Sequence, residues 1–247
     1  MQKKAAAPRP RRQASPERAP LTPTLIVEAA LAEIDAKGLD GFSMRGLGAA
    51  LGVEAMALYH HFPSKGRLLD AVMERLLDEA ELPERGSMHP LDRLRLFLES
   101  YRRIAINHPH AFILLAYRRF NTDRTFAFYE RILEALADAG FDPALSARFF
   151  RLMGYYVGGA GLADIASRAR EPDATPVTLE HSADAARFPR VAAVRPHLRV
   201  GNLDAIFEFG LDVIFAAMAK AADAAAVVPV KRTGSSRPSH ASKPRKR

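Results

Sequence analysis

The residues best suited to chemistry lie between Ser43 and Lys65, in the run SMRGLGAALGVEAMALYHHFPSK. Arg45 can bind a phosphate or a guanine edge, because its guanidinium fork fits guanine O6 and N7. Tyr59 and His61 carry a hydroxyl and an imidazole N–H, and both groups can donate to a phosphate. These donors permit contact with a nucleic acid, and a solvated Arg45 is the alternative at this point.

The middle of the run offers apolar contacts. Ala55, Met56 and Ala57 present no side-chain hydrogen bonds, so they can read thymine methyl groups or allow close approach to a base pair. Lys65 stands where a further helix begins, and the helix dipole there favours a phosphate. The alternative for Lys65 is an exposed lysine with no partner.

Composition and motifs argue against catalysis. The 247 residues include no cysteine, which excludes disulfides, thiolate metal sites and thiol nucleophiles. The sequence contains no G-x-S-x-G, no P-loop and no H-E-x-x-H motif. His108 and His110 are two residues apart, which is poor spacing for metal ligands on a helix. We therefore expect no enzyme activity, no cofactor and no metal site.

The formal charge of +8 is concentrated at the two ends of the chain. Residues 1–20 carry a net +5 and residues 231–247 carry +7, so the body between them is mildly acidic. Basic arms indicate a polyanion, with nucleic acid first and an acidic membrane surface second, or they only keep the protein soluble. No stretch predicts a membrane span or a secretory signal, so we expect a cytoplasmic, nucleoid-associated protein without membrane contact.

The elements that must position these residues are all helical. Thr22 and Pro23 suit a helix start, and Gly38 suits its end. No persistent alternation of period two occurs, so the sequence predicts an all-α fold. We expect a disordered basic arm at 1–20, a DNA-binding domain at 21–82, a helical ligand-binding and dimerisation domain at 88–226, and a disordered basic tail at 227–247. The expected helices cover about 22–37, 44–51, 54–59, 63–81, 90–107, 109–117, 123–139, 142–170, 182–194 (weakly) and 203–222.

The helices at 44–51 and 54–59 predict a helix-turn-helix. Gly52 supplies the left-handed residue of the turn, and Leu47 and Leu58 have the spacing to fill the angle between the helices. The second helix of such a motif enters the DNA major groove by its N-terminal part. The outward-facing residues of that helix would be Ala55, Met56, Ala57, Tyr59, His60 and His61.

The same run resembles the DNA-binding domain of tetracycline-repressor (TetR) family regulators. The resemblance covers about residues 22–75. Weaker cues for the family's ligand domain are Asn107-His108-Pro109 and the run from Phe207 to Asp212. The resemblance implies a homodimer that binds a palindromic double-stranded DNA operator, most often as a repressor, and that a small-molecule effector releases. The DNA-binding residues expected from the motif and the resemblance are Met44, Arg45, Ala55, Met56, Ala57, Tyr59, His60, His61 and Lys65.

Two glycines depart from the family pattern. The family commonly has Leu-Ala where this chain has Leu47-Gly48, and Gly46 lies beside them. Glycine within a helix costs about 1 kcal/mol relative to alanine. We expect close packing of the second helix on the third to be the reason.

The second domain is expected to provide dimerisation and an apolar ligand cavity. Gly154, Gly158 and Gly161 share one helix face and permit close approach of another helix. The resemblance implies that this helix and the last one form a four-helix bundle with a second copy. Tetracycline itself is not expected, because the segment 117–131 contains no histidine for a drug–magnesium chelate. The dimerisation residues of the last helix are expected to be Phe207, Leu211, Ile214 and Phe215. The expected ligand residues are His108, Phe112, Tyr117, Phe126, Tyr129, Phe149 and Tyr155, for each of which plain core packing is the alternative.

A different class of function also fits the charge. The two basic arms alone would support a non-specific architectural DNA-binding protein. Such a protein would continue to bind DNA after loss of the recognition helix but not after loss of both arms.

Overall fold

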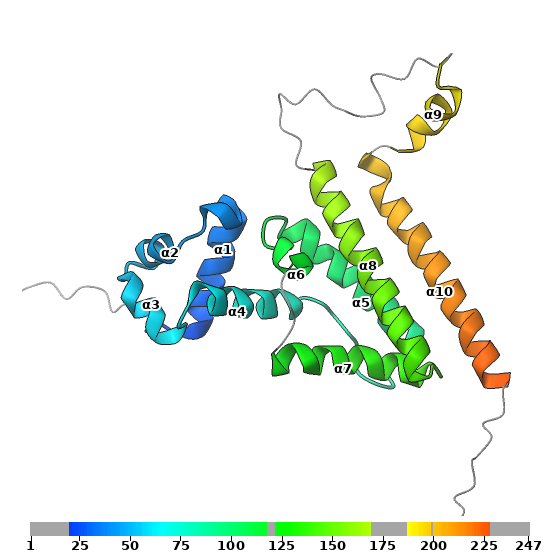
Figure 1. The fold of residues 1–247 in the computed structure, drawn as a ribbon, viewed down its shortest axis with the longest axis horizontal. Helices are drawn as coiled ribbons and strands as arrows, with labels where there is room; N and C mark the ends of the chain where they lie inside the picture. Colours follow the sequence, from blue (N-terminus) through cyan, green and yellow to red (C-terminus); the bar gives the residue numbers. More distant parts are fainter. Residues whose placement is uncertain (1–19, 118–121, 169–186, 199, 228–247) are drawn as a thin grey trace, which may run out of the picture. The chain divides into compact units, whose positions relative to one another are not determined.

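The computed structural model describes residues 20–117, 122–168, 187–198 and 200–227, and every regular element in these ranges is helical (Figure 1). The predicted all-α class is therefore confirmed. The expected arm and tail, together with the expected loop at 171–181, lie outside the described residues. The helices are α1 (Pro23–Gly41), α2 (Met44–Leu51), α3 (Ala55–His61), α4 (Lys65–Leu77), α5 (Pro90–Asn107), α6 (Ile113–Tyr117), α7 (Asp123–Asp138), α8 (Pro143–Arg168), α9 (Pro189–Val194) and α10 (Leu203–Val227), with two short 3₁₀ turns at Arg195–His197 and Val200–Asn202.

The chain forms two compact units. The N-terminal unit holds the described residues up to 76 together with 108–117, and the C-terminal unit holds 77–107 and the described residues from 122 onward. The expected division near residue 82 differs from this in two respects. The link between α4 and α5 belongs to the C-terminal unit, and α6 belongs to the N-terminal unit although it lies between α5 and α7 in the sequence.

Local signals explain the N-terminal unit. The Thr22 hydroxyl accepts a hydrogen bond from the N–H of Leu25 (3.2 Å) and so caps α1. The four-residue spacing of Ile26, Ala30 and Ile34 places all three in the core. Helical geometry breaks at Gly38, as predicted, where φ is 73°, and a short helical stretch follows it to Gly41. From α4, the residues fully buried in this core are Leu68, Val72, Met73 and Leu76.

Helix α5 is the central element of the C-terminal unit, because it packs against α7, α8 and α10. In Figure 1, α10 runs alongside α8. Thr122 and Thr125 form a reciprocal capping box that starts α7. Asp142 Oδ1 accepts from the N–H of Leu145 (2.7 Å) at the start of α8. No helix among the described residues has both the length and the apolarity that crossing a bilayer requires.

Buried polar contacts attach α10 to the unit. Arg102 of α5 donates from Nε to Asp164 of α8 (2.6 Å) and from Nη2 to Asp204 of α10 (2.8 Å). The Tyr156 hydroxyl donates to the carbonyl of Phe207 (2.7 Å), and the two rings stack with centroids 5.5 Å apart. Tyr156 lies so close to Gly210 that any β-carbon there would clash with its ring. Only glycine therefore fits this crossing.

Candidate DNA-binding site and ligand-binding unit

The helix-turn-helix is built by a tight turn between α2 and α3. Ser43 Oγ accepts from the N–H of Gly46 (3.0 Å) and caps α2. Gly52 has φ of 66° and ψ of 32°, a left-handed conformation that glycine adopts without strain. The N–H of Val53 then donates to the carbonyl of Gly48 (2.8 Å), which closes the turn. Leu58 of α3 is fully buried, so α3 is held in one orientation.

The two unusual glycines have different surroundings. A β-carbon on Gly48 would lie 2.9 Å from the carbonyl oxygen of Val53 and 3.2 Å from the nitrogen of Ala55. Both are main-chain atoms of the turn, so the expected close packing of α2 on α3 is confirmed at Gly48. A β-carbon on Gly46 would instead meet Glu33 Oε1 at 2.9 Å. That atom belongs to a side chain and not to the main chain, so it can give way by rotation, at the cost of its 2.5 Å contact with Lys37 Nζ.

Most of the predicted DNA-binding residues lie on the accessible surface of α2 and α3. Arg45, His60 and His61 are exposed, and Tyr59 is partly exposed. Met56 is 65% exposed, which is unusual for a large apolar side chain and leaves it accessible to a base pair. The residues on either side of it, Ala55 and Ala57, are half-buried.

Two predicted DNA contacts have other partners in the structure. Met44 is only 6% exposed and packs in the core, so little of its side chain is accessible and its predicted DNA contact stays a prediction that the burial disfavours. Lys65 Nζ donates to the carbonyl of Phe42 (2.6 Å) and lies 5.1 Å from the centre of the Phe42 ring. The Lys65 ammonium therefore joins the start of α4 to the α1–α2 junction, and its two remaining protons are available to a phosphate.

The predicted ligand residues do not gather at one site. His108 and Phe112 belong to the N-terminal unit. His108 Nδ1 lies 2.6 Å from Asp35 Oδ2 of α1, and Phe112 is fully buried. The side chain of Tyr117 lies outside the described residues. The segment of His108 and Phe112 therefore folds with α1 and not with α7 and α8, and a ligand role for these two residues stays a prediction.

The other four predicted ligand residues are in the C-terminal unit but point in different directions. Phe126 and Tyr155 are largely exposed, whereas Phe149 is buried against Phe141, with ring centroids 4.9 Å apart. Tyr129 lies edge-on to Phe150 (5.1 Å). Only Phe149 and Tyr129 therefore contribute to an aromatic interior.

The aromatic interior between α5, α7 and α8 contains two tyrosine hydroxyls, on Tyr101 and Tyr129. Phe97 contacts Tyr101 and Phe128 with ring centroids 5.8 and 5.5 Å apart. Burial raises the pKa of Tyr129 to about 12, and burial followed by the nearby Tyr129 raises the pKa of Tyr101. Both hydroxyls stay protonated at physiological pH, so this interior suits neutral, aromatic contacts.

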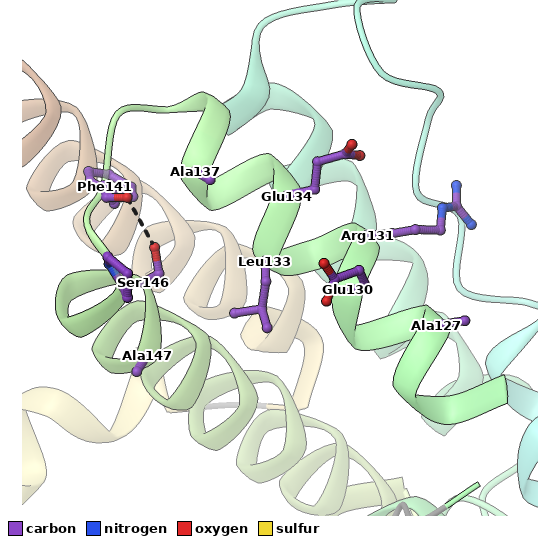
Figure 2. Close-up of a pocket in the computed structure, with 10 residues that line it drawn as sticks. Ala127, Glu130, Arg131, Leu133, Glu134, Ala137, Phe141, Ser146 and Ala147 are labelled. Carbon is purple, nitrogen blue, oxygen red and sulfur yellow. Dashed lines mark hydrogen bonds between the residues drawn. The ribbon is translucent and has the colours of Figure 1, made fainter. Parts of the chain in front are cut away.

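An open groove of about 740 Å³ runs between α7 and the start of α8 (Figure 2). Its volume falls in the range of small-molecule sites, roughly 300–1,000 Å³. None of the predicted ligand residues lines it. The sequence offered no signal for it, because alternating alanines and charges on α7 are typical of a solvated helix face. The residues that line the groove are Ala127, Glu130, Arg131, Leu133, Glu134, Ala137, Phe141, Pro143, Ser146 and Ala147.

The predicted dimerisation face of α10 is turned inward. Phe207, Leu211 and Ile214 are buried in this chain's own core, as is Gly161 of α8, which leaves little of their surface to a second copy, and their role in dimerisation stays a prediction. Phe215 is half-buried, and Gly154 and Gly158 remain at least partly accessible. The accessible apolar residues follow an i, i+3, i+7 spacing on each helix. They are Leu152, Tyr155 and Gly159 on α8, and Ile206, Phe209 and Val213 on α10.

Comparisons with known proteins cover both units. Residues 26–72 match the family described as bacterial regulatory proteins, tetR family, and residues 82–222 match the tetracyclin repressor-like C-terminal domain. An HTH-type transcriptional regulator of Saccharopolyspora erythraea is 30% identical over 204 residues, covering 82% of this chain and 86% of that protein. The class G tetracycline repressor of Vibrio anguillarum is 30% identical over 200 residues, covering 77% and 90%.

A solved structure shares both fold and sequence. The Streptomyces coelicolor TetR family protein ActR in complex with actinorhodin superposes with a TM-score of 0.70 at 28% identity, covering 83% of this chain and 99% of that one. These three relatives are all transcriptional regulators. The chain belongs to the tetR family of bacterial regulatory proteins.

Proposed function

We propose that this protein is a homodimeric, ligand-responsive transcriptional repressor that binds a palindromic operator and leaves it when a small molecule binds the C-terminal unit. The observation that carries the proposal is the exposed surface of α2 and α3. It combines an exposed guanidinium at Arg45 with exposed Met56, Tyr59 and His60 on a motif in which Gly48 leaves no room for a β-carbon.

The side chains on this surface divide into two roles. Arg45 and His60 carry donors that can read base edges, and Met56 can contact a thymine methyl group. Tyr59 and His61 are suited to phosphates, which set the position of α3 on the duplex but carry no sequence information. Specificity then depends on few residues, so single substitutions should change it.

The dimer proposal depends on the accessible apolar face of α8 and α10. Tyr155 and Phe209 are 68% and 70% exposed, which is costly for an isolated chain in water. A second copy covering this face would remove the cost and would place two recognition helices for the two half-sites of a palindrome. Phe209→Lys should give a monomer by light scattering at micromolar concentration. A wild-type chain that is itself monomeric would contradict the proposal.

A small organic effector is proposed for the C-terminal unit. ActR is solved with actinorhodin, and tetracycline repressors are among the relatives, so organic ligands occur in similar proteins. The aromatic interior and the groove beside α7 offer largely apolar surroundings. To weaken operator binding about 100-fold, the effector must prefer the non-binding form by about 2.7 kcal/mol.

Selection of bound DNA from a random pool tests the proposed function. A recovered palindrome supports it, and no recovered preference contradicts it. The architectural alternative predicts that a chain truncated to residues 21–230 loses DNA binding, whereas a specific repressor keeps its preference. Arg45→Ala in the full chain separates the two further: a specific repressor should lose part of its sequence preference, whereas an architectural protein has no preference to lose.

A further inference from the structure

The segment between α4 and α5 is irregular in structure but closely held. Residues 78–89 connect α4 of the N-terminal unit to the C-terminal unit, and we call them the linker. Ala80 and Leu82 are buried, with 7% and 6% of their surfaces exposed. The linker is therefore packed as part of the C-terminal unit and is not a loose tether.

The main chain of the linker is bound at three successive residues. The N–H of Glu81 donates to Ser100 Oγ of α5 (2.8 Å). The carbonyl of Leu82 accepts from Arg131 Nη2 of α7 (2.6 Å). The carbonyl of Pro83 accepts from Arg93 Nε of α5 (3.0 Å). Two of the three contacts are made by guanidinium groups, which form stronger hydrogen bonds than neutral donors.

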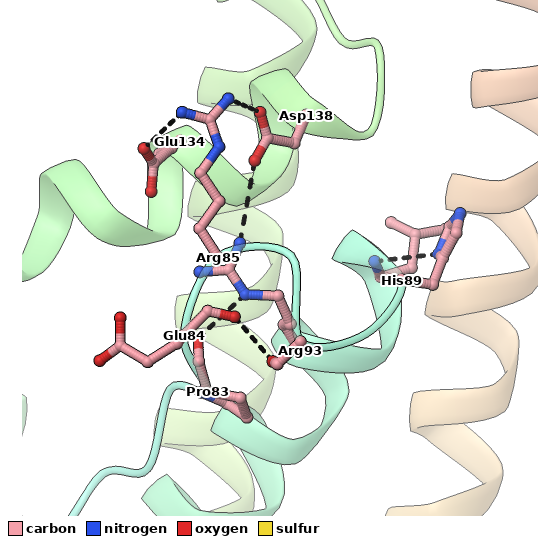
Figure 3. Close-up of polar contacts among 9 residues, drawn as sticks. Pro83, Glu84, Arg85, His89, Arg93, Glu134 and Asp138 are labelled. Atoms are coloured by element: carbon pink, nitrogen blue, oxygen red, sulfur yellow. Dashed lines mark hydrogen bonds and ion pairs between the residues drawn. The ribbon is translucent and has the colours of Figure 1, made fainter.

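A shared carboxylate adds a second attachment (Figure 3). Arg85 of the linker lies between two acids of α7, with Nη1 at 3.0 Å from Glu134 Oε1 and Nη2 at 2.6 Å from Asp138 Oδ1. Asp138 also faces Arg93, whose Nη1 is 3.9 Å from Oδ2. Arg93 is only 2% exposed, so Asp138 provides the counter-charge for a buried cation.

Arg131 of α7 contacts both the linker and the groove. It lines the groove of Figure 2 and also holds the Leu82 carbonyl. Glu134 likewise lines the groove and also contacts the linker, through its ion pair with Arg85. Two side chains of α7 thus both line the groove and contact the linker, and the linker continues directly into α4.

We propose that Arg131 is a positioning residue that couples the two units: by holding the linker main chain at Leu82 it links the state of α7 to the state of the DNA-binding motif. The inference rests on the proposed function, because it concerns how operator binding is regulated. The new element is the contact between Arg131 and the Leu82 carbonyl. Because coupling between two sites is reciprocal, the effect of operator DNA on α7 and the linker can be measured without knowing the effector.

The test uses the full-length chain, its selected operator and hydrogen–deuterium exchange. Operator DNA should slow exchange in the wild type at residues 21–76 and also in the linker and α7. Arg131→Met keeps side-chain length but removes the donor. Linker amides should then exchange about tenfold faster without DNA, as expected for loss of a charged hydrogen bond. In this variant, operator DNA should slow exchange only at residues 21–76.

Two further variants separate coupling from general stability. Arg131→Lys retains a donor that can reach the Leu82 carbonyl, so it should restore the response of α7 to DNA. Arg148→Met, at an exposed arginine of α8, should behave as the wild type. Unchanged linker exchange in Arg131→Met, or unchanged protection of α7 by DNA, would overturn the inference alone. A wild-type chain that selects no DNA sequence would overturn the proposed function and this inference together.

Discussion

Replacing each of the two glycines of α2 by alanine tests how closely α2 packs on the turn before α3. A β-carbon at position 48 meets main-chain atoms, the Val53 oxygen at 2.9 Å and the Ala55 nitrogen at 3.2 Å. A β-carbon at position 46 meets side-chain atoms, with the Glu33 carboxylate at 2.9 Å and Ser43 Oγ at 3.1 Å. Gly46→Ala is therefore the matched control for Gly48→Ala, with the same chemical change in the same helix.

The two substitutions should change the free energy of unfolding to different extents, with only Gly46→Ala gaining stability. Each gains about 1 kcal/mol, because alanine favours the helix over glycine. Overpacking against atoms that cannot rotate away costs about 1–3 kcal/mol. We expect Gly46→Ala to be more stable than the wild type by up to about 1 kcal/mol. Gly48→Ala should range from neutral to about 2 kcal/mol less stable.

Urea unfolding and operator binding should be measured on the same preparations. Because the added methyl group at position 48 pushes α3 away from α2, operator affinity should fall about tenfold in Gly48→Ala, which corresponds to about 1.4 kcal/mol. Gly46→Ala should bind as the wild type does. If both variants are equally stable and bind equally well, the close contact at Gly48 does not position α3 and the reasoning is refuted.

Three other outcomes are expected. Arg45→Ala should weaken operator binding by about 1–3 kcal/mol, and repeated selection should show relaxed preference at one base pair; uniform loss across all sequences would indicate a phosphate contact instead. Deleting residues 1–20, which carry a net +5, should reduce the slope of log K against log salt, and an unchanged slope would exclude the arm from the complex. Asp164→Ala leaves Arg102 buried with only the exposed Asp204 as its acidic partner, so urea unfolding should show a loss of about 3 kcal/mol; a loss below about 1 kcal/mol would mean that solvent reaches the Arg102 guanidinium.

Many helix boundaries could be predicted because their signals are local. Ser43 caps α2, Gly52 takes the left-handed turn, and Thr22 caps α1, each within a few residues of the sequence position that indicated it. The exposed positions of Arg45, Tyr59, His60 and His61 followed from the same short-range geometry. The burial of Met44 was not predicted, because the first residue of a helix can face either the core or the solvent, and its neighbours do not decide which.

The sequence by itself determined the all-α class and the helix-turn-helix, because capping, turns and helical periodicity act over a few residues, and its resemblance to known regulators indicated the family. Only the tertiary structure decided which apolar stripe of α10 faces the chain's own core, since Phe207 and Phe209 are equally apolar and differ only in what packs on them. It also decided that α6 and His108 fold with α1, and that Arg131 reaches the carbonyl of Leu82. Such contacts join residues distant in the sequence, and spacing along the chain carries no information about them.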